Sequence, residues 1–159
     1  MDICAADIGN AYLNADCAER IYTVAGKEFG PRLQGKVLIV SKALYGLKSS
    51  GAAWRNHLSS SIQDMGFTSS RGDPDLYFRA ACKDDGTEYY EYLLVYVNDI
   101  ICVSHKTKEI MDEFAQLYRL KEGSIGPPSR YLGADIGVIA NSFGKECWAM
   151  SSDSEHSSN

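Results

Sequence analysis

The order of strand-like and helix-like segments predicts an α+β fold, with an antiparallel sheet and helices packed on one of its faces. Three observations support this: short β-branched segments between glycines, two stretches with helical apolar spacing, and apolar runs joined by tight turns. The chain has 159 residues, of which 45% are apolar and 23% are charged. This composition is typical of one globular domain with a single core.

Three strand-like segments lie within the first 40 residues. Residues 1–8 are mainly small or apolar and contain Asp7 just before a Gly-Asn step, which predicts a buried strand that runs into a turn. Residues 19–24 and 36–40 are short β-branched segments separated by glycines and a proline, and we expect two strands joined by a loop. Asp7 should therefore lie at the end of the first strand.

A first helix is predicted between residues 47 and 65. Four apolar residues recur there at spacings of four, four and three, which places them on one helical face. They are Trp54, Leu58, Ile62 and Met65. Gly66 follows where a helix commonly ends. Such a stripe needs no role beyond packing, so we interpret Trp54 as a core residue.

A second helix is predicted to begin at residue 107. Thr107 is a residue type that commonly caps a helix, and Gly123 is expected to end the segment before a Pro-Pro step. Apolar residues recur on one side of the helix between these points. They are Ile110, Met111, Phe114 and Leu117.

Hairpins are expected on either side of the second helix. Residues 75–82 and 89–97 flank a Lys-Asp-Asp-Gly turn, whose Asp-Gly step favours the positive φ angles of a tight hairpin. Residues 131–139 and 147–150 flank an Asn-Ser-Phe-Gly turn in the same way. Both pairs should contribute antiparallel strands.

A further hairpin is predicted around Asn98 and Asp99. The apolar runs 93–97 and 100–103 lie directly before and after these two polar residues. We therefore expect a hairpin with a carboxylate at its apex.

The domain is expected to span residues 1–150, followed by a disordered tail over residues 151–159. This tail has five serines and no apolar residue. No stretch is apolar enough to span a membrane and no signal peptide is recognisable, so a cytoplasmic or nuclear location is expected. Five isolated cysteines predict reduced thiols, and a net charge of -5 argues against a large phosphate-binding surface.

Asp7 and Asp99 are candidate metal ligands, because each lies at the end of a predicted strand and one sheet would bring them together. Clustered carboxylates repel, and a divalent cation such as Mg²⁺ commonly compensates. Asn and Asp are also ordinary turn residues, so a plain hairpin tip explains the same pattern. The Asp73-Pro74-Asp75 pair is interpreted as a turn. Motifs of NTPases, serine hydrolases and zinc proteases are absent from the sequence.

Several segments, read in order, resemble the reverse transcriptases of copia-type LTR retrotransposons. The family patterns D-V-x-x-A-F-L-N-G, S-L-Y-G-L-K-Q, D-P-x-L-Y and L-Y-V-D-D are similar to residues 7–16, 42–48, 73–77 and 94–100. Residues 131–136 are similar to the family segment Y-F-L-G-I-E-I that follows. Together these segments cover residues 2–150 in the family's order. The resemblance implies the antiparallel palm of an RNA-directed DNA polymerase.

The resemblance also implies a two-metal site that binds Mg²⁺ and acts on a primer 3′-hydroxyl. Asp7 matches the first metal-binding aspartate, Ile8 would contribute a backbone carbonyl, and Asp99 matches the last aspartate of the hairpin. The implied partners are an RNA or DNA primer-template and a deoxynucleoside triphosphate.

Five residues match family positions that bind the nucleotide. Tyr12 matches the aromatic residue that excludes a ribose 2′-hydroxyl, and a role as a core aromatic after the first strand is compatible with this match. The other four are Tyr45, Gly46, Lys48 and Tyr96.

The sequence departs from the family pattern at the hairpin, where Asn98 replaces the first of two aspartates. The metal site thereby falls from three carboxylates to two, which predicts an inactive or strongly impaired enzyme. Residues 49–52 also replace the family's Q-A-P-R and remove a basic residue. Because the chain begins almost at the first motif and stops before any thumb, we expect the fingers and thumb to be missing.

Two alternatives remain open at this point. One is an active subunit that obtains its fingers and thumb from another chain. The other is a non-enzymatic module that reuses the palm sheet to bind protein or nucleic acid. In either case, exposed palm surfaces are expected to favour weak self-association.

Overall fold

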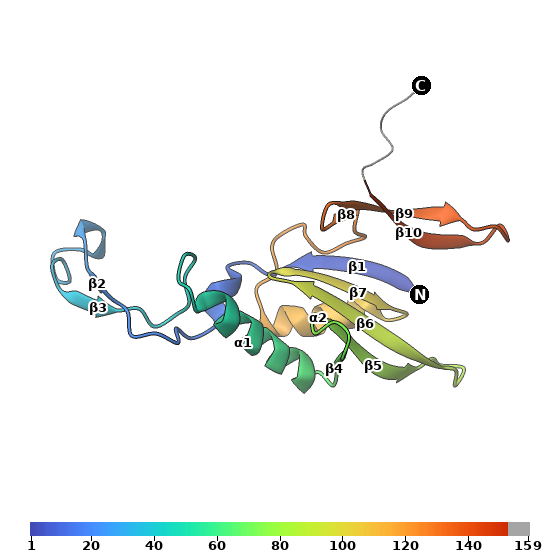
Figure 1. Cartoon of the computed structure of the whole chain (residues 1–159), viewed down its shortest axis with the longest axis horizontal. Coiled ribbons are helices and arrows are strands. Elements are labelled where there is room, and N and C mark those ends of the chain that lie inside the picture. The colour runs from blue at the N-terminus through green and yellow to red at the C-terminus, as the bar shows by residue number, and fades with distance from the viewer. Residues whose placement is uncertain (153–159) are drawn as a thin grey trace, which may run out of the picture.

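A computed structural model describes residues 1–152, which form a mixed α+β fold built on a five-stranded antiparallel sheet (Figure 1). Neighbouring strands in this sheet follow the order β1-β7-β6-β5-β4. Their bounds, in that order, are Asp2–Asp7, Asp99–Ser104, Glu88–Tyr96, Leu76–Cys82 and Thr68–Ser69. The hairpins expected before the second helix are therefore confirmed, and β1 pairs with β7 although most of the chain separates them.

Two smaller sheets flank the central one. β2 (Tyr22–Val24) and β3 (Val37–Ile39) form a hairpin that projects from one end of the molecule, and a short 3-10 helix, η2 (Lys27–Phe29), lies between them (Figure 1). β8, β9 and β10 form the other sheet, drawn above β1 in Figure 1. Their bounds are Arg130–Tyr131, Ala134–Ala140 and Glu146–Ser152.

The β9–β10 hairpin confirms the expected pairing across the Asn-Ser-Phe-Gly turn. β10 continues through Ser152. The remaining part of the expected tail, residues 153–159, lies outside the described residues.

The first helix, α1 (Ser50–Asp64), begins three residues later than the spacing predicts. The hydroxyl of the buried Ser50 accepts a hydrogen bond from the backbone N–H of Leu44 at 3.0 Å. The chain from Leu44 to Ser50 is therefore a loop that folds back on the helix start. A 3-10 helix, η1 (Ala11–Asn14), contacts α1 from the end of β1.

The second helix, α2 (Thr107–Leu117), has the expected start but not the expected cap. Thr107 is its first helical residue and makes no capping hydrogen bond, so the predicted capping role is wrong. Instead, the hydroxyl of Ser104 accepts a hydrogen bond from the backbone N–H of Lys106 at 2.8 Å. Leu117 is exposed, and Tyr118 is buried in its place.

Both helices bury their apolar residues against the same face of the central sheet. Along β7, Ile100 and Cys102 face this core. Asp99 and Ile101 face the opposite side, because side chains alternate along a strand. The largest fully buried side chains of the helices are Trp54, Ile62, Ile110, Met111 and Phe114. None of the described helices is long and apolar enough to cross a membrane.

One charged residue, Glu91 of β6, is buried within the fold. Its carboxylate accepts hydrogen bonds from Arg79 on β5 at 2.9 Å and from the Ser104 hydroxyl at 2.7 Å. Burial by itself would raise the pKa of Glu91, but these hydrogen bonds outweigh it and lower the pKa. The buried carboxylate is thus compensated by its partners.

Candidate functional site: a carboxylate pair at a hairpin tip

The site lies where β1 ends beside the start of β7. Asp7 is the last residue of β1 and Asp99 is the first residue of β7, and the two occupy directly paired positions. Paired residues of adjacent strands project to the same side of a sheet. The structure therefore places both candidate metal ligands side by side, on the face opposite the helices.

The turn between β6 and β7 consists of Val97 and Asn98, one position earlier than the sequence predicts. Tyr96 pairs with Asp99, so Asp99 belongs to the strand and does not form the apex. Val97 has a φ of 55°, which is unusual for a β-branched residue. The Trp54 indole N–H donates a hydrogen bond to the Val97 carbonyl oxygen at 2.6 Å, and this contact holds the strained turn.

Asn98 faces Asp7 through its side-chain amide. The Asn98 Nδ2 donates a hydrogen bond to Asp7 Oδ1 at 2.5 Å and lies 3.4 Å from Asp99 Oδ1. The Asn98 carbonyl oxygen also accepts the backbone N–H of Ile8 at 2.8 Å. An aspartate at this position would direct a third carboxylate towards Asp7, whereas the amide makes an attractive contact.

Lys121 completes the site and has no counterpart in the residues predicted from the sequence. Its Nζ lies 2.5 Å from Asp7 Oδ2, and its backbone N–H donates to the Asp7 carbonyl oxygen at 2.8 Å. The hydroxyl of Ser124 accepts the Asp7 backbone N–H at 3.1 Å. Asp7 is thus held by the loop that follows α2, as well as by the sheet.

The charges at this site shift the pKa values of neighbouring groups. Burial and the nearby Asp7 raise the pKa of Asp99. The hydrogen bond to Asp7 raises the pKa of Lys121. Burial, with a contribution from Asp99, raises the pKa of Tyr131 to about 12. Asp7 thus contributes to the raised pKa of both Asp99 and Lys121, as expected for a negative charge close to each.

The oxygen donors fit a hard divalent cation in kind, but only two of the three side chains at the tip are carboxylates. Carboxylate oxygens are the ligands that Mg²⁺ prefers, and Asp7 and Asp99 supply them. Within residues 1–152, no group of three or more His, Cys, Asp or Glu side chains is placed to hold a metal ion. The third member of the expected triad is the uncharged Asn98, and both oxygens of Asp7 already accept donors from the chain.

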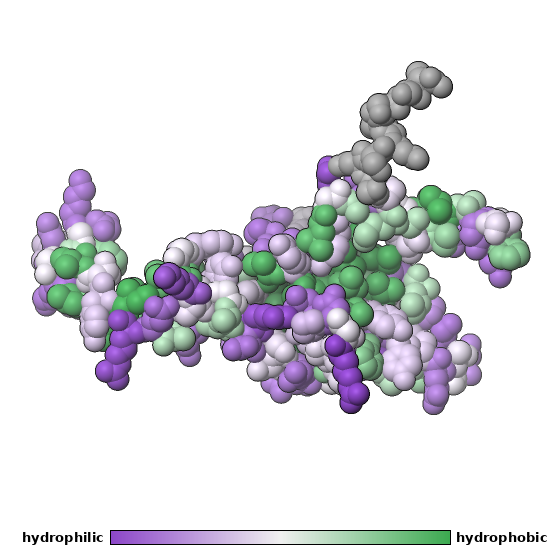
Figure 2. All heavy atoms as spheres, viewed as in Figure 1, coloured by the Kyte–Doolittle hydropathy of each residue, from purple (hydrophilic) through white to green (hydrophobic). Residues whose placement is uncertain are grey.

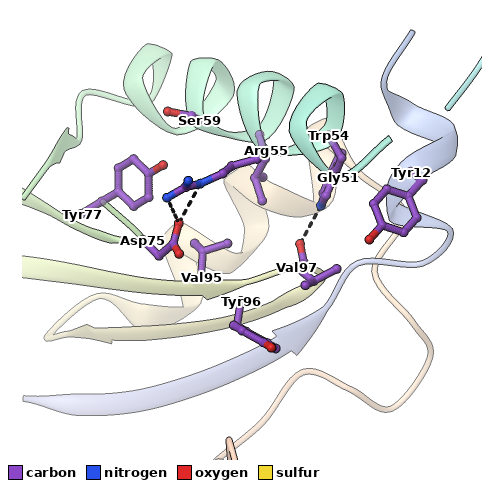
Figure 3. A pocket seen from close by; sticks show the side chains of 11 residues that line it. Tyr12, Gly51, Trp54, Arg55, Ser59, Asp75, Tyr77, Val95, Tyr96 and Val97 are labelled. Carbon is purple, nitrogen blue, oxygen red and sulfur yellow. Dashed lines mark hydrogen bonds and ion pairs between the residues drawn. The ribbon is translucent and has the colours of Figure 1, made fainter. Parts of the chain in front are cut away.

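Two cavities lie on either side of the hairpin tip. One, of about 410 Å³, contains Asp7 and Asp99 and is also lined by Tyr131 and Leu132. The other, of about 200 Å³, lies between α1 and strands β5 and β6 (Figure 3). The cavity that contains the carboxylates and the cavity along α1 are therefore separate, and they lie on either side of the turn.

Some of the predicted nucleotide-binding residues line the second cavity. Tyr12 and Tyr96 line it. Tyr96 also pairs with Asp99, so its ring lies on the same side of the sheet as Asp99. The exposed Tyr45 ring contacts Tyr12 edge-on, with 4.4 Å between ring centroids. Gly46 and Lys48 lie in the loop before α1 and do not line the cavity.

An ion pair crosses the second cavity and was not predicted. Arg55 of α1 donates to Asp75 Oδ1 from its Nε at 3.0 Å and from its Nη2 at 2.7 Å (Figure 3). Asp75 also donates its backbone N–H to Asp73 Oδ1 at 2.9 Å, as expected for a turn. Gly51 replaces the family's proline at this cavity, and a Cβ there would meet nothing within 4 Å.

Comparison with known proteins identifies the family. The model of the family described as reverse transcriptase (RNA-dependent DNA polymerase) matches residues 2–149. A putative transposon Ty5-1 protein of Saccharomyces cerevisiae is 29% identical over 139 residues, which are 85% of this chain and 43% of that protein.

Two polyproteins show the same similarity over a small part of their length. The retrovirus-related Pol polyprotein from transposon RE2 of Arabidopsis thaliana is 28% identical over 73% of this chain and 8% of its own length. The transposon Ty1-GR1 Gag-Pol polyprotein of S. cerevisiae is 28% identical over 82% of this chain and 7% of its own. The chain spans less than half of the length of each of these three relatives. It belongs to the reverse transcriptase family of copia-type LTR retrotransposons.

Proposed function

We propose that this chain is the palm of an RNA-directed DNA polymerase in which Asp7 and Asp99 bind the catalytic metal and Asn98 strongly impairs catalysis. The observation that carries the proposal is the direct pairing of Asp7 with Asp99 beside the hairpin tip. Reverse transcriptases use divalent metal ions, and the oxygen donors at this tip are suited to Mg²⁺.

The roles of the chain's own groups follow from their positions. Asp7 and Asp99 would hold the metal with their carboxylates, with the Ile8 carbonyl as a further oxygen donor. A metal bound there would favour the ionised primer 3′-hydroxyl and balance the charge of the leaving pyrophosphate. Tyr12, supported by the Tyr45 ring, would close the space beside a sugar 2′ position.

Impairment follows from the charge of the site. Replacement of a carboxylate by an amide removes one of three negative charges from the metal ligands. In a site with little water, such a contact contributes several kcal/mol, and each step of about 1.4 kcal/mol in the barrier changes the rate tenfold. Catalysis by the unmodified chain is therefore expected to be orders of magnitude slower than catalysis by the variant Asn98→Asp.

Primer extension with an RNA template, together with Mn²⁺-dependent binding of dTTP, tests this proposal. We expect Asn98→Asp to increase both, and the double variant Asn98→Asp with Asp99→Asn to lose the gain. Equal dTTP binding and extension in all three proteins would reject the proposal.

A second candidate function is supported by a separate surface. The β2–β3 hairpin exposes four apolar side chains, with exposed fractions of 58–67%. They are Tyr22, Val24, Val37 and Ile39. Figure 2 shows apolar residues gathered on this projecting hairpin. A face of this kind suits a protein partner better than nucleic acid, because these four side chains carry no positive charge. A defined partner in a pull-down that fails with Val37→Lys would favour this non-enzymatic function.

A further inference from the structure

Each oxygen of the Asp7 carboxylate accepts a hydrogen bond from a group of the chain, and one of these groups is a cation. Asp7 Oδ1 accepts the Asn98 amide and Asp7 Oδ2 accepts the Lys121 ammonium, both at 2.5 Å. We infer that Lys121 is a built-in counter-ion of the carboxylate site, which competes with divalent metal for Asp7 and lowers the metal affinity of the folded chain. The inference rests on the proposed function only in taking Asp7 and Asp99 as the metal ligands.

The position of Lys121 is set by the backbone and is not that of an arbitrary surface lysine. The loop after α2 runs along β1 with several backbone hydrogen bonds: Lys121 donates to Asp7, Gly9 donates to Arg119, and Ala5 exchanges two bonds with Gly126. These bonds measure 2.7–3.1 Å. The loop therefore holds the backbone of Lys121 beside Asp7, with the side chain within reach of the carboxylate.

The charge balance indicates why this lysine would oppose metal binding. Two carboxylates and one ammonium together carry a single negative charge, so Lys121 removes half of the charge that attracts a cation. A divalent ion at Asp7 Oδ2 would be repelled by the ammonium that contacts the same oxygen. Removing the lysine should therefore strengthen metal binding, and bound metal should in turn release the lysine, because such coupling is reciprocal.

Lys121 is able to leave without unfolding the chain. Its side chain is 53% exposed and sits on a flexible four-carbon stem, whereas the Asp7 side chain is only 24% exposed. Displacement thus exposes a mobile ammonium to water and leaves the sheet and the loop in place. The Lys121 ammonium and a divalent metal ion would therefore compete for the Asp7 carboxylate.

The chain contains a matched control for this ion pair. Lys42 pairs with Asp16 at 2.8 Å and is 49% exposed, close to the value for Lys121. Asp16, however, is 87% exposed, so its ion pair lies in water and not beside the two paired carboxylates. Lys42→Gln therefore removes a lysine of similar exposure without changing the Asp7 site.

Mn²⁺ affinity, measured by electron paramagnetic resonance on the whole chain, tests the inference. We expect Lys121→Gln to bind Mn²⁺ about tenfold more tightly than the unmodified chain. Lys121→Arg, which keeps the charge, and Lys42→Gln should both retain the original affinity. Equal affinity of Lys121→Gln and the unmodified chain would overturn the inference.

A measurement on the unmodified chain covers the case in which Lys121→Gln does not fold. Acetylation by acetic anhydride, resolved for each lysine by mass spectrometry, should become several-fold faster at Lys121 when Mn²⁺ saturates the site. The Lys42 rate should not change. A Lys121 rate that is insensitive to Mn²⁺ would also overturn the inference.

The same titrations separate this inference from the proposed function. If Asp7→Asn and Asp99→Asn leave Mn²⁺ affinity unchanged, the carboxylates are not the metal site and the proposed function fails. If these variants weaken binding but Lys121→Gln has no effect, only the counter-ion role of Lys121 fails.

Discussion

At the residue scale, the tip of the β6–β7 hairpin depends on one side-chain amide. Asn98 donates to Asp7 and therefore stabilises the carboxylate pair in the absence of metal. An aspartate there would place like charges in contact unless a cation lies between them. Asn98 thus supplies a hydrogen bond within the chain at a position where an aspartate would need a cation.

The variant Asn98→Asp should make folding stability depend on metal. Without divalent cation, we expect a loss of about 1–3 kcal/mol, because a partly buried hydrogen bond becomes a repulsive contact. Mg²⁺ at millimolar concentration should recover most of this loss. Urea unfolding with and without Mg²⁺ measures both effects.

Asn98→Ala provides the control, since it removes the hydrogen bond without adding a charge. Its smaller loss of stability should not respond to Mg²⁺. A variant Asn98→Asp that is equally stable with and without Mg²⁺ would contradict the account of this contact.

The sequence predicts part of this site at the residue scale. Asp7 and Asp99 are recognisable because Asp7 follows an apolar run and Asp99 lies between two others, and the resemblance to the family implies that they share one sheet. Lys121 carries no such signal, because its contact with Asp7 spans 114 positions and depends on a loop path. The turn is displaced by one residue because Trp54 and Ile8 bind its two carbonyl oxygens, and these tertiary contacts override the local turn preference.

At the element scale, α1 serves as a clamp on the hairpin. Its Trp54 is buried in the core, as the apolar stripe predicts, and its indole N–H also reaches the Val97 carbonyl. A stripe of apolar spacing reveals burial but not the direction of a single N–H group, so this second role is not visible in the sequence.

Trp54→Phe should loosen the turn while the core remains largely filled. We expect a loss of about 1–2 kcal/mol, because the strained Val97 carbonyl loses its partner. Hydrogen exchange at residues 96–99 should accelerate more than exchange in α2. Trp148→Phe, at the other tryptophan of the chain, should leave exchange at the turn unchanged. If both variants behave alike, Trp54 acts only as a core residue.

The buried Glu91 predicts that the stability of the paired strands β5, β6 and β7 depends on pH. Its pKa is lowered in the folded chain, so the ionised form stabilises the fold above the unfolded pKa of about 4.3. This contribution is lost as the pH falls through the folded pKa. Glu91→Gln should lower stability at pH 7 by roughly 2–3 kcal/mol, because Arg79 loses its charged partner.

Urea unfolding at pH 7 and pH 3 measures this effect. The difference in stability between the chain and Glu91→Gln should shrink towards pH 3. Asp16→Asn, at an exposed ion pair, should have little effect at either pH. A constant difference between the chain and Glu91→Gln across this range would contradict the assigned role.

At the scale of the whole molecule, the strand and helix order is largely predictable, and the placement of the outer hairpins is not. Apolar runs between turn residues and helical stripes identify the central sheet and both helices because these residues share one core. The projection of β2 and β3 has no equivalent signal. Their residues read as ordinary strands, although four of their apolar side chains remain exposed.

This exposed face predicts weak, concentration-dependent self-association. Size-exclusion chromatography should give an apparent mass that rises above 17.5 kDa as concentration increases. The double variant Val24→Lys with Val37→Lys should remain at the monomer mass, because charges on the face cannot be buried without cost. Lys145→Glu, on the separate β9–β10 hairpin, serves as a charge-changing control. Association that is unaffected by the double variant would assign it to another surface.

Titration with Mn²⁺ by calorimetry decides whether Asp7 and Asp99 form a metal site that the amide of Asn98 weakens, as we propose. We expect weak binding to the unmodified chain, binding at least about tenfold tighter to Asn98→Asp, and loss of binding in Asp7→Asn. Equal Mn²⁺ affinity in the chain and in Asn98→Asp would contradict this proposal.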